Sequence, residues 1–168
     1  VYKRQAVGSM DFGGSTLNRR YSPSPDRGTT RRTSDVFALA TAVLFQSPVQ
    51  HFALTPSCLT DAPAWAVDFM KQVPSTWDEI CFIDGYPGRY VVLARRSGDV
   101  WYIAGINGTK ESLQLTISLP MLAAGTQLQL YSDDAALNGG VTTAKTTKKG
   151  TLKVEMPVNG AFVAVTSR

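Results

Sequence analysis

The chain has 168 residues, of which 43% are hydrophobic and 18% charged, and its formal net charge is +4. This composition is typical of a globular protein with enough apolar side chains for a core. No run of about 18 apolar residues is present, so the sequence predicts no membrane span.

The excess positive charge lies in residues 1–34, where seven Lys and Arg accompany two Asp. A basic arm that binds nucleic acid is one interpretation. Aromatic residues do not alternate with the arginines, however, and no helix-turn-helix or RNA-binding signature follows. We therefore expect an exposed loop and no nucleic acid partner. Residues 1–5, VYKRQ, resemble a translated sequencing adapter and are excluded from the fold prediction.

Residues 1–73 alternate between short apolar runs and helical patterns. The segment 13–34 is rich in Gly, Ser, Pro, Thr and Arg, which is typical of a long loop. Thr33-Ser34-Asp35 provides N-cap chemistry for a helix, and residues 36–45 are apolar on nearly every side. A short strand is predicted at 49–53 and a second helix at 63–73.

This order of elements predicts the C-terminal end of a β/α barrel. Two β/α units cannot close a barrel alone, so a truncated domain is expected. We therefore also expect residues 36–45 to expose hydrophobic surface.

From Pro74 the hydrophobic period changes to two, and residues 74–168 predict a small antiparallel β-sandwich domain. Turn residues such as Asn107-Gly108, Asn138-Gly139-Gly140 and Asn159-Gly160 separate the apolar runs. The predicted strands are Glu79–Ile83, Tyr90–Arg95, Trp101–Ile106, Leu113–Ser118, Gln127–Tyr131, Thr151–Glu155 and Phe162–Thr166. The fold class is thus mixed: a partial barrel segment followed by a sandwich.

Two residues are candidates for substrate contact because each lies at the end of a predicted barrel strand, where such barrels place their active sites. His51 is the only histidine, and Asp11 precedes the long loop. A structural role for His51 and a loop-organising role for Asp11 are the alternatives. The two cysteines, Cys58 and Cys81, do not predict a disulfide.

Other groups of acidic or aromatic residues give weaker indications of a functional site. Asp78 and Glu79 are adjacent, so on a strand they would point to opposite faces and could not easily flank one bond. Asp133-Asp134 is typical of a turn, and a calcium site built from it alone is improbable. The aromatic residues could form a sugar-stacking platform or, as we favour, the core and the seam between the two domains. They are Trp77, Tyr86, Tyr90, Trp101 and Tyr102.

Four segments resemble the C-terminal part of glycoside hydrolase family 97. They are GSMDF (8–12), SPVQHFAL (47–54), residues 68–108 and the closing β module. The order of Pro-x-x-Trp-Asp-Glu, Pro-Gly-x-Tyr and Ala-Arg within 73–107 carries the likeness most strongly.

The resemblance implies a fragment of an enzyme that hydrolyses α-glucosides or α-galactosides, with calcium in its site and a β domain that supports the barrel. It implies an α-linked oligosaccharide as substrate and a periplasmic or secreted location. The family's catalytic and calcium-binding carboxylates precede Met10-Asp11, so none is assigned here and the fragment alone is expected to be inactive. Asp11 and His51 match positions near the pocket. The alternative is a free-standing carbohydrate-binding module that exposes Tyr86, Trp101 and Tyr102.

Overall fold

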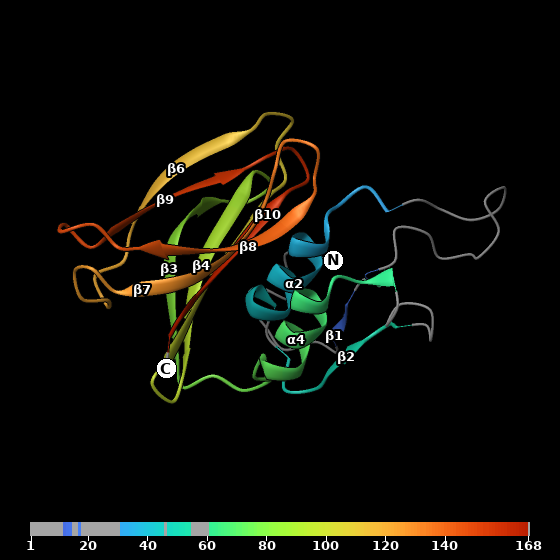
Figure 1. The fold of residues 1–168 in the computed structure, drawn as a ribbon, viewed down its shortest axis with the longest axis horizontal. Helices are drawn as coiled ribbons and strands as arrows, with labels where there is room; N and C mark the ends of the chain where they lie inside the picture. The colour runs from blue at the N-terminus through green and yellow to red at the C-terminus, as the bar shows by residue number, and fades with distance from the viewer. Residues whose placement is uncertain (1–11, 15–16, 18–30, 46, 55–60, 168) are drawn as a thin grey trace, which may run out of the picture.

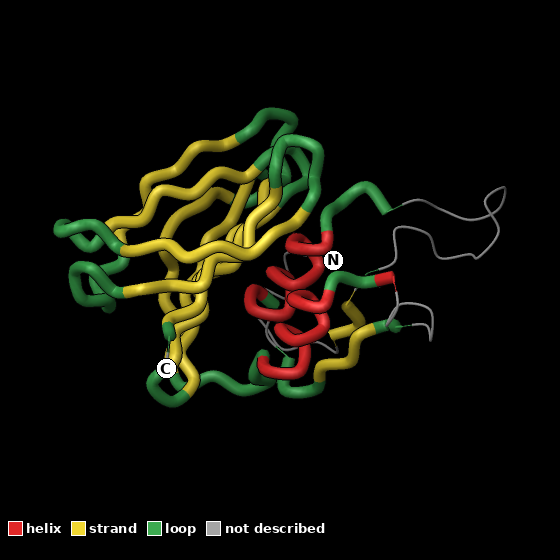
Figure 2. The backbone as a smooth tube through the Cα atoms, in the orientation of Figure 1, coloured by secondary structure: helices red, strands yellow, loops and turns green. Residues whose placement is uncertain are grey.

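The computed structural model describes residues 12–14, 17, 31–45, 47–54 and 61–167. A six-stranded sheet forms its middle layer, two helices cover one face of this sheet, and a two-stranded ribbon covers the other (Figure 1). The helices and the short strands beside them lie on one side of the sheet, as the tube in Figure 2 also shows. Within the described residues, no helix is both long and apolar enough to cross a membrane.

The first elements form a β–α–β unit followed by a helix. Strands β1 (Phe12–Gly14) and β2 (Gln50–Phe52) pair in parallel, and helix α2 (Asp35–Leu44) lies between them in the sequence. Helix α4 (Ala64–Gln72) follows β2. Both helices and the strand β2 lie within two residues of the ranges predicted for them. One parallel pair of three-residue strands does not make a barrel, so the partial barrel stays a prediction.

The remaining strands form two antiparallel sheets that face each other as a sandwich. The larger sheet has the order β3-β4-β5-β10-β7-β8, and the smaller one pairs β6 with β9. The strands are β3 (Glu79–Tyr86), β4 (Tyr90–Ser97), β5 (Val100–Asn107), β6 (Leu113–Ser118), β7 (Gln127–Asp133), β8 (Gly139–Lys145), β9 (Thr151–Met156) and β10 (Ala161–Thr166). All seven predicted strands are present, and the prediction of a β-sandwich is confirmed.

Strand β8 was not predicted. Its start, Gly139-Gly140, was interpreted as part of a turn, and its other residues are mostly polar. Because β8 is an edge strand and its central residues are exposed, it lacks the apolar alternation that marks a half-buried strand.

Two hydrophobic cores lie on opposite faces of the large sheet, since successive side chains of a strand point to opposite faces. On β5, Tyr102 and Ala104 join the helix-side core, whereas Trp101 and Ile103 join the ribbon-side core. The helix-side core includes seven buried residues of α2. The expectation that residues 36–45 expose hydrophobic surface is therefore wrong: Val36, Leu39 and Val43 are fully buried.

Candidate functional site

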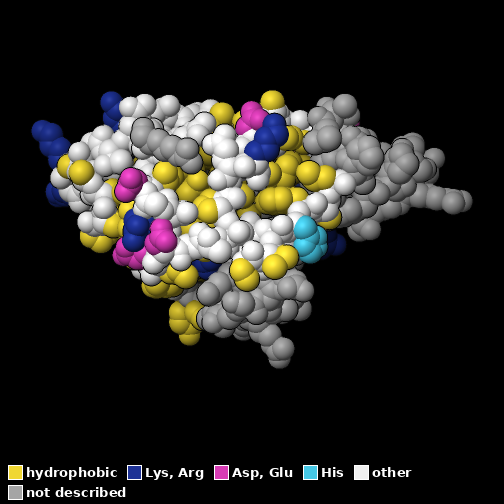
Figure 3. All heavy atoms as spheres, turned by 90° about the horizontal axis from the view of Figure 1, so that it is seen from below, with side chains coloured by type: hydrophobic (Ala, Val, Ile, Leu, Met, Phe, Trp, Pro, Cys, Tyr) yellow, Lys and Arg dark blue, Asp and Glu magenta, His cyan; other side chains and the backbone are white. Residues whose placement is uncertain are grey.

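Of the two predicted substrate contacts, the structure describes His51 but not Asp11. His51 is the middle residue of β2, pairs with Gly13 of β1, and is exposed, as the cyan side chain in Figure 3 shows. Gln50, next to it, donates a hydrogen bond from Nε2 to the Ala42 carbonyl of α2 (3.0 Å), which fixes β2 against that helix. Asp11 and most of the long loop lie outside the described residues. A pocket role for Asp11 and His51 thus stays a prediction.

Calcium requires six to eight oxygen ligands, several of them carboxylates. Within the described parts of the chain, no group of three or more His, Cys, Asp or Glu residues could hold a metal ion. The residues described here therefore do not fit the calcium implied by the family resemblance.

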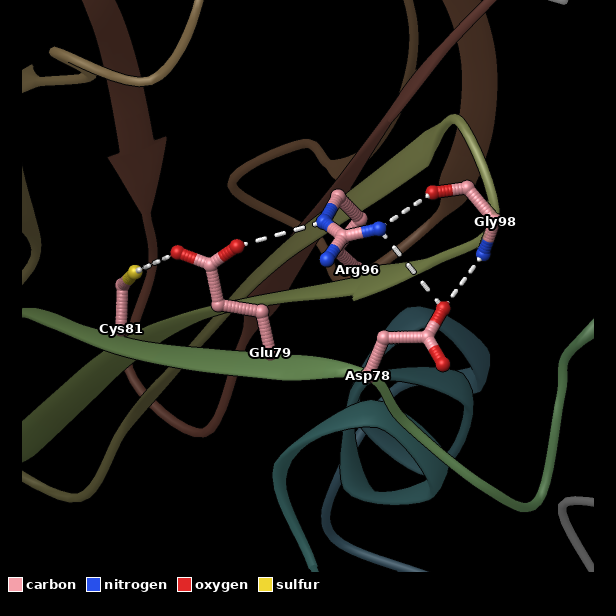
Figure 4. Close-up of polar contacts among 5 residues, drawn as sticks. All are labelled: Asp78, Glu79, Cys81, Arg96 and Gly98. Carbon is pink, nitrogen blue, oxygen red and sulfur yellow. Dashed lines mark hydrogen bonds and ion pairs between the residues drawn. The ribbon is translucent and has the colours of Figure 1, made fainter.

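Asp78 and Glu79 contact one arginine rather than each other (Figure 4). Arg96 donates from Nε to Glu79 Oε2 (3.2 Å), and its other side approaches Asp78 Oδ2 (3.7 Å). Asp78 also accepts a hydrogen bond from the backbone N–H of Gly98 (2.8 Å). All three charged side chains are substantially solvent-accessible, so this cluster organises the ends of β3 and β4 and does not form a dry catalytic pair.

The thiol of Cys81 belongs to the same cluster. It lies 3.7 Å from Glu79 Oε1 and is not in a disulfide. Burial, together with the negative charge of Glu79 and the hydrogen bond to it, raises the pKa of this thiol. A thiol with a raised pKa is a poor nucleophile at neutral pH, so the position does not indicate a catalytic cysteine.

Buried polar contacts instead gather where helix α2 meets the sheet. At its N-terminus, Ser34 Oγ accepts a hydrogen bond from the Phe37 N–H (2.9 Å) and donates one to Asp133 Oδ2 (2.5 Å). Asp133 is the last residue of β7, and its Oδ2 also accepts from the Ala161 N–H of β10 (2.9 Å). One carboxylate oxygen thus joins the helix cap to two strands.

Asp133 is buried, and its second oxygen, Oδ1, has no hydrogen-bond partner. Burial raises the pKa of this carboxyl to about 6, although the hydrogen bonds from Ser34 and Ala161 act in the opposite direction. Asp134, by contrast, accepts hydrogen bonds from Asn138 and from the Ala136 N–H, and these lower its pKa. The turn predicted at this pair is present from Asp134, whereas Asp133 ends the preceding strand.

At the other end of α2, Arg95 of β4 donates hydrogen bonds to carbonyl groups at the C-terminus of the helix. Its Nη2 lies 2.9 Å from the Leu44 carbonyl oxygen, and its Nη1 lies 3.4 Å from that of Phe45. The side chain is fully buried, and Trp77 stacks near it, with 5.8 Å between the guanidinium carbon and the ring centroid. Burial lowers the pKa of Arg95 to about 10, so the group stays charged at neutral pH and complements the negative end of the helix dipole.

Aromatic rings fill the space between these two polar anchors. Phe69 of α4 packs edge-on against Tyr102 and Tyr131 of the sheet, at centroid distances of 6.4 and 5.1 Å. Trp77 contacts Tyr102 at 5.3 Å, and Trp65 contacts Tyr131 at 6.0 Å. The favoured interpretation of Trp77 and Tyr102 as a seam between the helices and the β domain is therefore supported.

The carbohydrate-binding alternative required three exposed aromatic residues. Only Tyr86 is exposed; Trp101 and Tyr102 are buried, on opposite faces of the sheet. They cannot form one stacking surface, so the described residues do not provide that platform.

The sequence patterns did not predict Arg95 and Asp133 as structural anchors. The period-two pattern of β4 contained a usable signal, because Arg95 shares a face with Val91 and Leu93, which pack in the helix-side core. For Asp133 no comparable signal exists, since the partner Ser34 is 99 residues away. Together these contacts clamp α2 to the sheet at both ends.

Comparison with known proteins identifies the domain. Residues 76–166 match the family described as "Glycosyl-hydrolase 97 C-terminal, oligomerisation". The chain belongs to glycoside hydrolase family 97. The matched residues include all eight strands of the sandwich, so the family 97 domain provides the sheet to which α2 and α4 are attached.

Two curated relatives carry names of α-galactosidases. A "Probable retaining alpha-galactosidase" of Streptomyces bingchenggensis is 33% identical over 169 residues, which cover 98% of this chain. A "Retaining alpha-galactosidase" of Bacteroides thetaiotaomicron is 36% identical over 111 residues, or 61% of this chain. The chain spans only 24% and 16% of the lengths of these relatives.

Two solved structures extend the likeness to nearly the whole chain. A crystal structure of a β-arabinopyranosidase has 52% sequence identity and a TM-score of 0.90, and the match covers 96% of this chain and 26% of that one. A family 97 enzyme from Pseudoalteromonas sp. strain K8, in complex with panose, has a TM-score of 0.78 at 22% identity, with the same coverage. The second likeness is evidence for the fold alone.

Proposed function

We propose that this chain is the C-terminal part of a glycosidase that removes terminal sugars with the ring configuration of α-galactose. The chief support is the 52% identity to a β-arabinopyranosidase over 96% of the chain, against 33% and 36% for the two α-galactosidases. The corresponding identity to the panose-bound enzyme is 22%.

The two activities named for the relatives concern closely related sugars. A β-L-arabinopyranoside has the ring stereochemistry of an α-D-galactopyranoside and lacks only its hydroxymethyl group. An α-D-glucopyranoside differs from the galactoside in the orientation of the C4 hydroxyl. A pocket built to hydrogen-bond an axial C4 hydroxyl would leave polar groups unpaired when glucose binds, which costs far more than the loss of one hydroxymethyl contact. We therefore favour arabinopyranosides and galactosides over glucosides.

The chemistry would be supplied by residues outside those described here. Glycosidases of this type need two carboxylates flanking the scissile bond, about 5–5.5 Å apart in enzymes that retain anomeric configuration. Both curated relatives are named as retaining enzymes, so we propose retention. The family resemblance supports calcium as cofactor, a periplasmic or secreted location, and no hydrolysis by the 168-residue chain alone.

For the described residues we propose a supporting role. A barrel helix that faces the sheet must bury its apolar surface and satisfy its terminal polar groups. The contacts of Ser34 with Asp133, and of Arg95 with the last carbonyls of α2, meet the second need. They would keep β2, and thus His51, in a fixed position relative to the pocket.

His51 is our candidate for a substrate contact at the rim of that pocket. In the full-length enzyme, His51→Ala is expected to raise KM several-fold and to change kcat less, because a rim contact contributes to ground-state binding. The measurement is steady-state kinetics on the preferred aryl glycoside. An equal fall in kcat and kcat/KM would contradict a rim role.

The proposed specificity is tested with the full-length enzyme and three p-nitrophenyl substrates: β-L-arabinopyranoside, α-D-galactopyranoside and α-D-glucopyranoside. We expect kcat/KM to be highest for the arabinopyranoside, lower for the galactoside and lowest for the glucoside. Proton NMR of the first-formed sugar should show the anomeric configuration of the substrate. The proposal would be overturned if the glucoside were the best substrate or if none were hydrolysed.

A further inference from the structure

A groove lies where the N-terminal ends of both helices meet the turn between β7 and β8. Residues 31–35 line it from the start of α2, Pro63 lines it from the start of α4, and residues 136–139 line it from the turn. Its volume is about 340 Å³, which is within the range of small-ligand sites. The groove is therefore formed jointly by the β/α unit and the β domain.

The groove lies at the end of the β/α unit where barrels place their active sites. Residues 31–34 end the connection between β1 and α2, and Pro63 ends the connection between β2 and α4. Both connections begin at the carboxyl ends of parallel strands, and substrates of β/α barrels bind at that end. The groove thus lies on the same side of the unit as the proposed substrate pocket, but it is lined by helix ends and by the β domain.

The turn on the β-domain side of the groove has a fixed shape. The Asp134 carboxylate accepts hydrogen bonds from the backbone N–H groups of Ala136 and Asn138 (2.8 Å each) and from Asn138 Nδ2 (3.1 Å). These bonds hold Leu137 at a φ of 62°, in the left-handed region that leucine seldom adopts. Backbone that neighbouring contacts hold in such a conformation is frequent at ligand-binding sites.

The start of β8 lies close to both helices, beside the first turn of α2 (Figure 1). A Cβ atom at Gly139 would lie only 2.8 Å from the Trp65 ring of α4 and 2.9 Å from the Val36 side chain of α2. Only a residue without a side chain permits this approach. The turn and the helix ends therefore keep a fixed spacing across the groove.

The lining combines charges of both signs with neutral polar and apolar groups. Arg31 forms an ion pair with Asp35, so these two charges compensate each other. Arg32 and Asn138 are exposed and offer hydrogen-bond donors and an acceptor, and Leu137 adds apolar surface. Such a mixture fits an uncharged ligand that has both hydroxyl groups and C–H surface, as a sugar does.

We infer that this groove binds the leaving-group sugars of an extended oligosaccharide whose terminal sugar occupies the proposed pocket. The inference rests on the proposed function and adds that the β domain contacts substrate through its β7–β8 turn. Contacts far from the scissile bond contribute binding energy only when the substrate is long enough to reach them. The enzyme therefore discriminates between glycosides by the length of the leaving group.

Steady-state kinetics of the full-length enzyme on p-nitrophenyl α-D-galactopyranoside and on stachyose test the groove. Both substrates have a terminal α-galactose, but in stachyose three further sugars follow it. We expect Arg32→Ala and Leu137→Gly to lower kcat/KM for stachyose at least threefold. They should change kcat/KM for the aryl galactoside little, because its leaving group is too short to reach the groove. Leu137→Gly should not impair folding, since glycine adopts a positive φ without strain.

Lys148→Ala is the matched control, because Lys148 is also an exposed cation but lies in the turn at the other end of β8. It should change neither value. The inference is overturned if neither groove variant changes the ratio of the two values, if the aryl galactoside is affected as much as stachyose, or if Lys148→Ala has the same effect.

The groove and the proposed function can fail separately. Hydrolysis of the aryl galactoside, without any effect of the groove variants on stachyose, would refute the groove alone. If the aryl glucoside were the best substrate, the proposed specificity would fail. The same comparison between maltotetraose and the aryl glucoside would then still test the groove, with the same expected and contradicting results.

Discussion

Arg95 lies in an unfavourable environment for a charged side chain. Its guanidinium is fully buried, and its Nε has no hydrogen-bond partner. The Leu44 and Phe45 carbonyls and the Trp77 ring compensate for the lost contacts with water. Arg95→Ala would remove a charged donor from two buried acceptors and leave a cavity. We expect a loss of about 3 kcal/mol in the free energy of unfolding, measured with urea.

Arg96→Ala is the matched control for that variant, since Arg96 is the next residue on β4 but forms exposed ion pairs with Asp78 and Glu79. Such pairs contribute at most about 1 kcal/mol. Equal losses in the two variants would contradict the clamp at the end of α2.

Asp133 makes the stability of the fold depend on pH. Its pKa is about 6 in the folded protein, above the ordinary value of 3.8, so the folded state binds a proton more readily than the unfolded state. Its contribution is therefore fully present below about pH 4 and is lost as the pH rises through 6. Asp133→Asn, which keeps one acceptor and cannot ionise, should flatten this dependence.

The measurement is the difference in unfolding free energy between the wild type and Asp133→Asn from pH 4 to pH 7.5. Because one pKa unit corresponds to about 1.4 kcal/mol, the wild type should lose on the order of 2 kcal/mol relative to the variant over this range. A constant difference would show that Asp133 does not titrate there.

At the scale of elements, the attachment of α2 links the stability of the helices to that of the sheet. Ser34 both caps the helix and binds Asp133, so Ser34→Ala removes two interactions together. We expect a loss of about 1–2 kcal/mol by chemical denaturation. Thr33→Ala, one residue earlier and outside these contacts, should cost less than about 0.5 kcal/mol.

A double-mutant cycle separates the cap from the link to the sheet. If Ser34 and Asp133 act together, the losses for Ser34→Ala and Asp133→Asn should not be additive, and the coupling should exceed about 0.5 kcal/mol. Additive losses would reduce Ser34 to an ordinary N-cap.

Across the whole molecule, local patterns predicted the regular elements well. The alternation of Leu113, Leu115 and Ile117 predicted β6 at its observed bounds, and the N-cap chemistry of Thr33-Ser34-Asp35 predicted the start of α2. The polar edge strand β8 was missed because it does not bury a regular apolar face. The predicted exposure of α2 was wrong because its apolar surface packs in the helix-side core, a contact between segments far apart in sequence.

The candidate site depended even more on distant contacts. His51 became a candidate because it is the only histidine and lies in a predicted strand, but sequence spacing gives no measure of what it contacts. Arg95 and Asp133 acquire their roles from partners 51 and 99 residues away. The β-sandwich was thus predictable from local periodicity, whereas the polar clamp depended on the tertiary fold.

We expect the helices and the family 97 domain to form one cooperative unit, clamped by Arg95 and Asp133. Differential scanning calorimetry of the 168-residue chain, as wild type and as Arg95→Ala, checks this expectation. We predict a single transition with equal calorimetric and van't Hoff enthalpies, and a shift of that whole transition to lower temperature in the variant. Two separate transitions, of which Arg95→Ala moves only one, would contradict the claim.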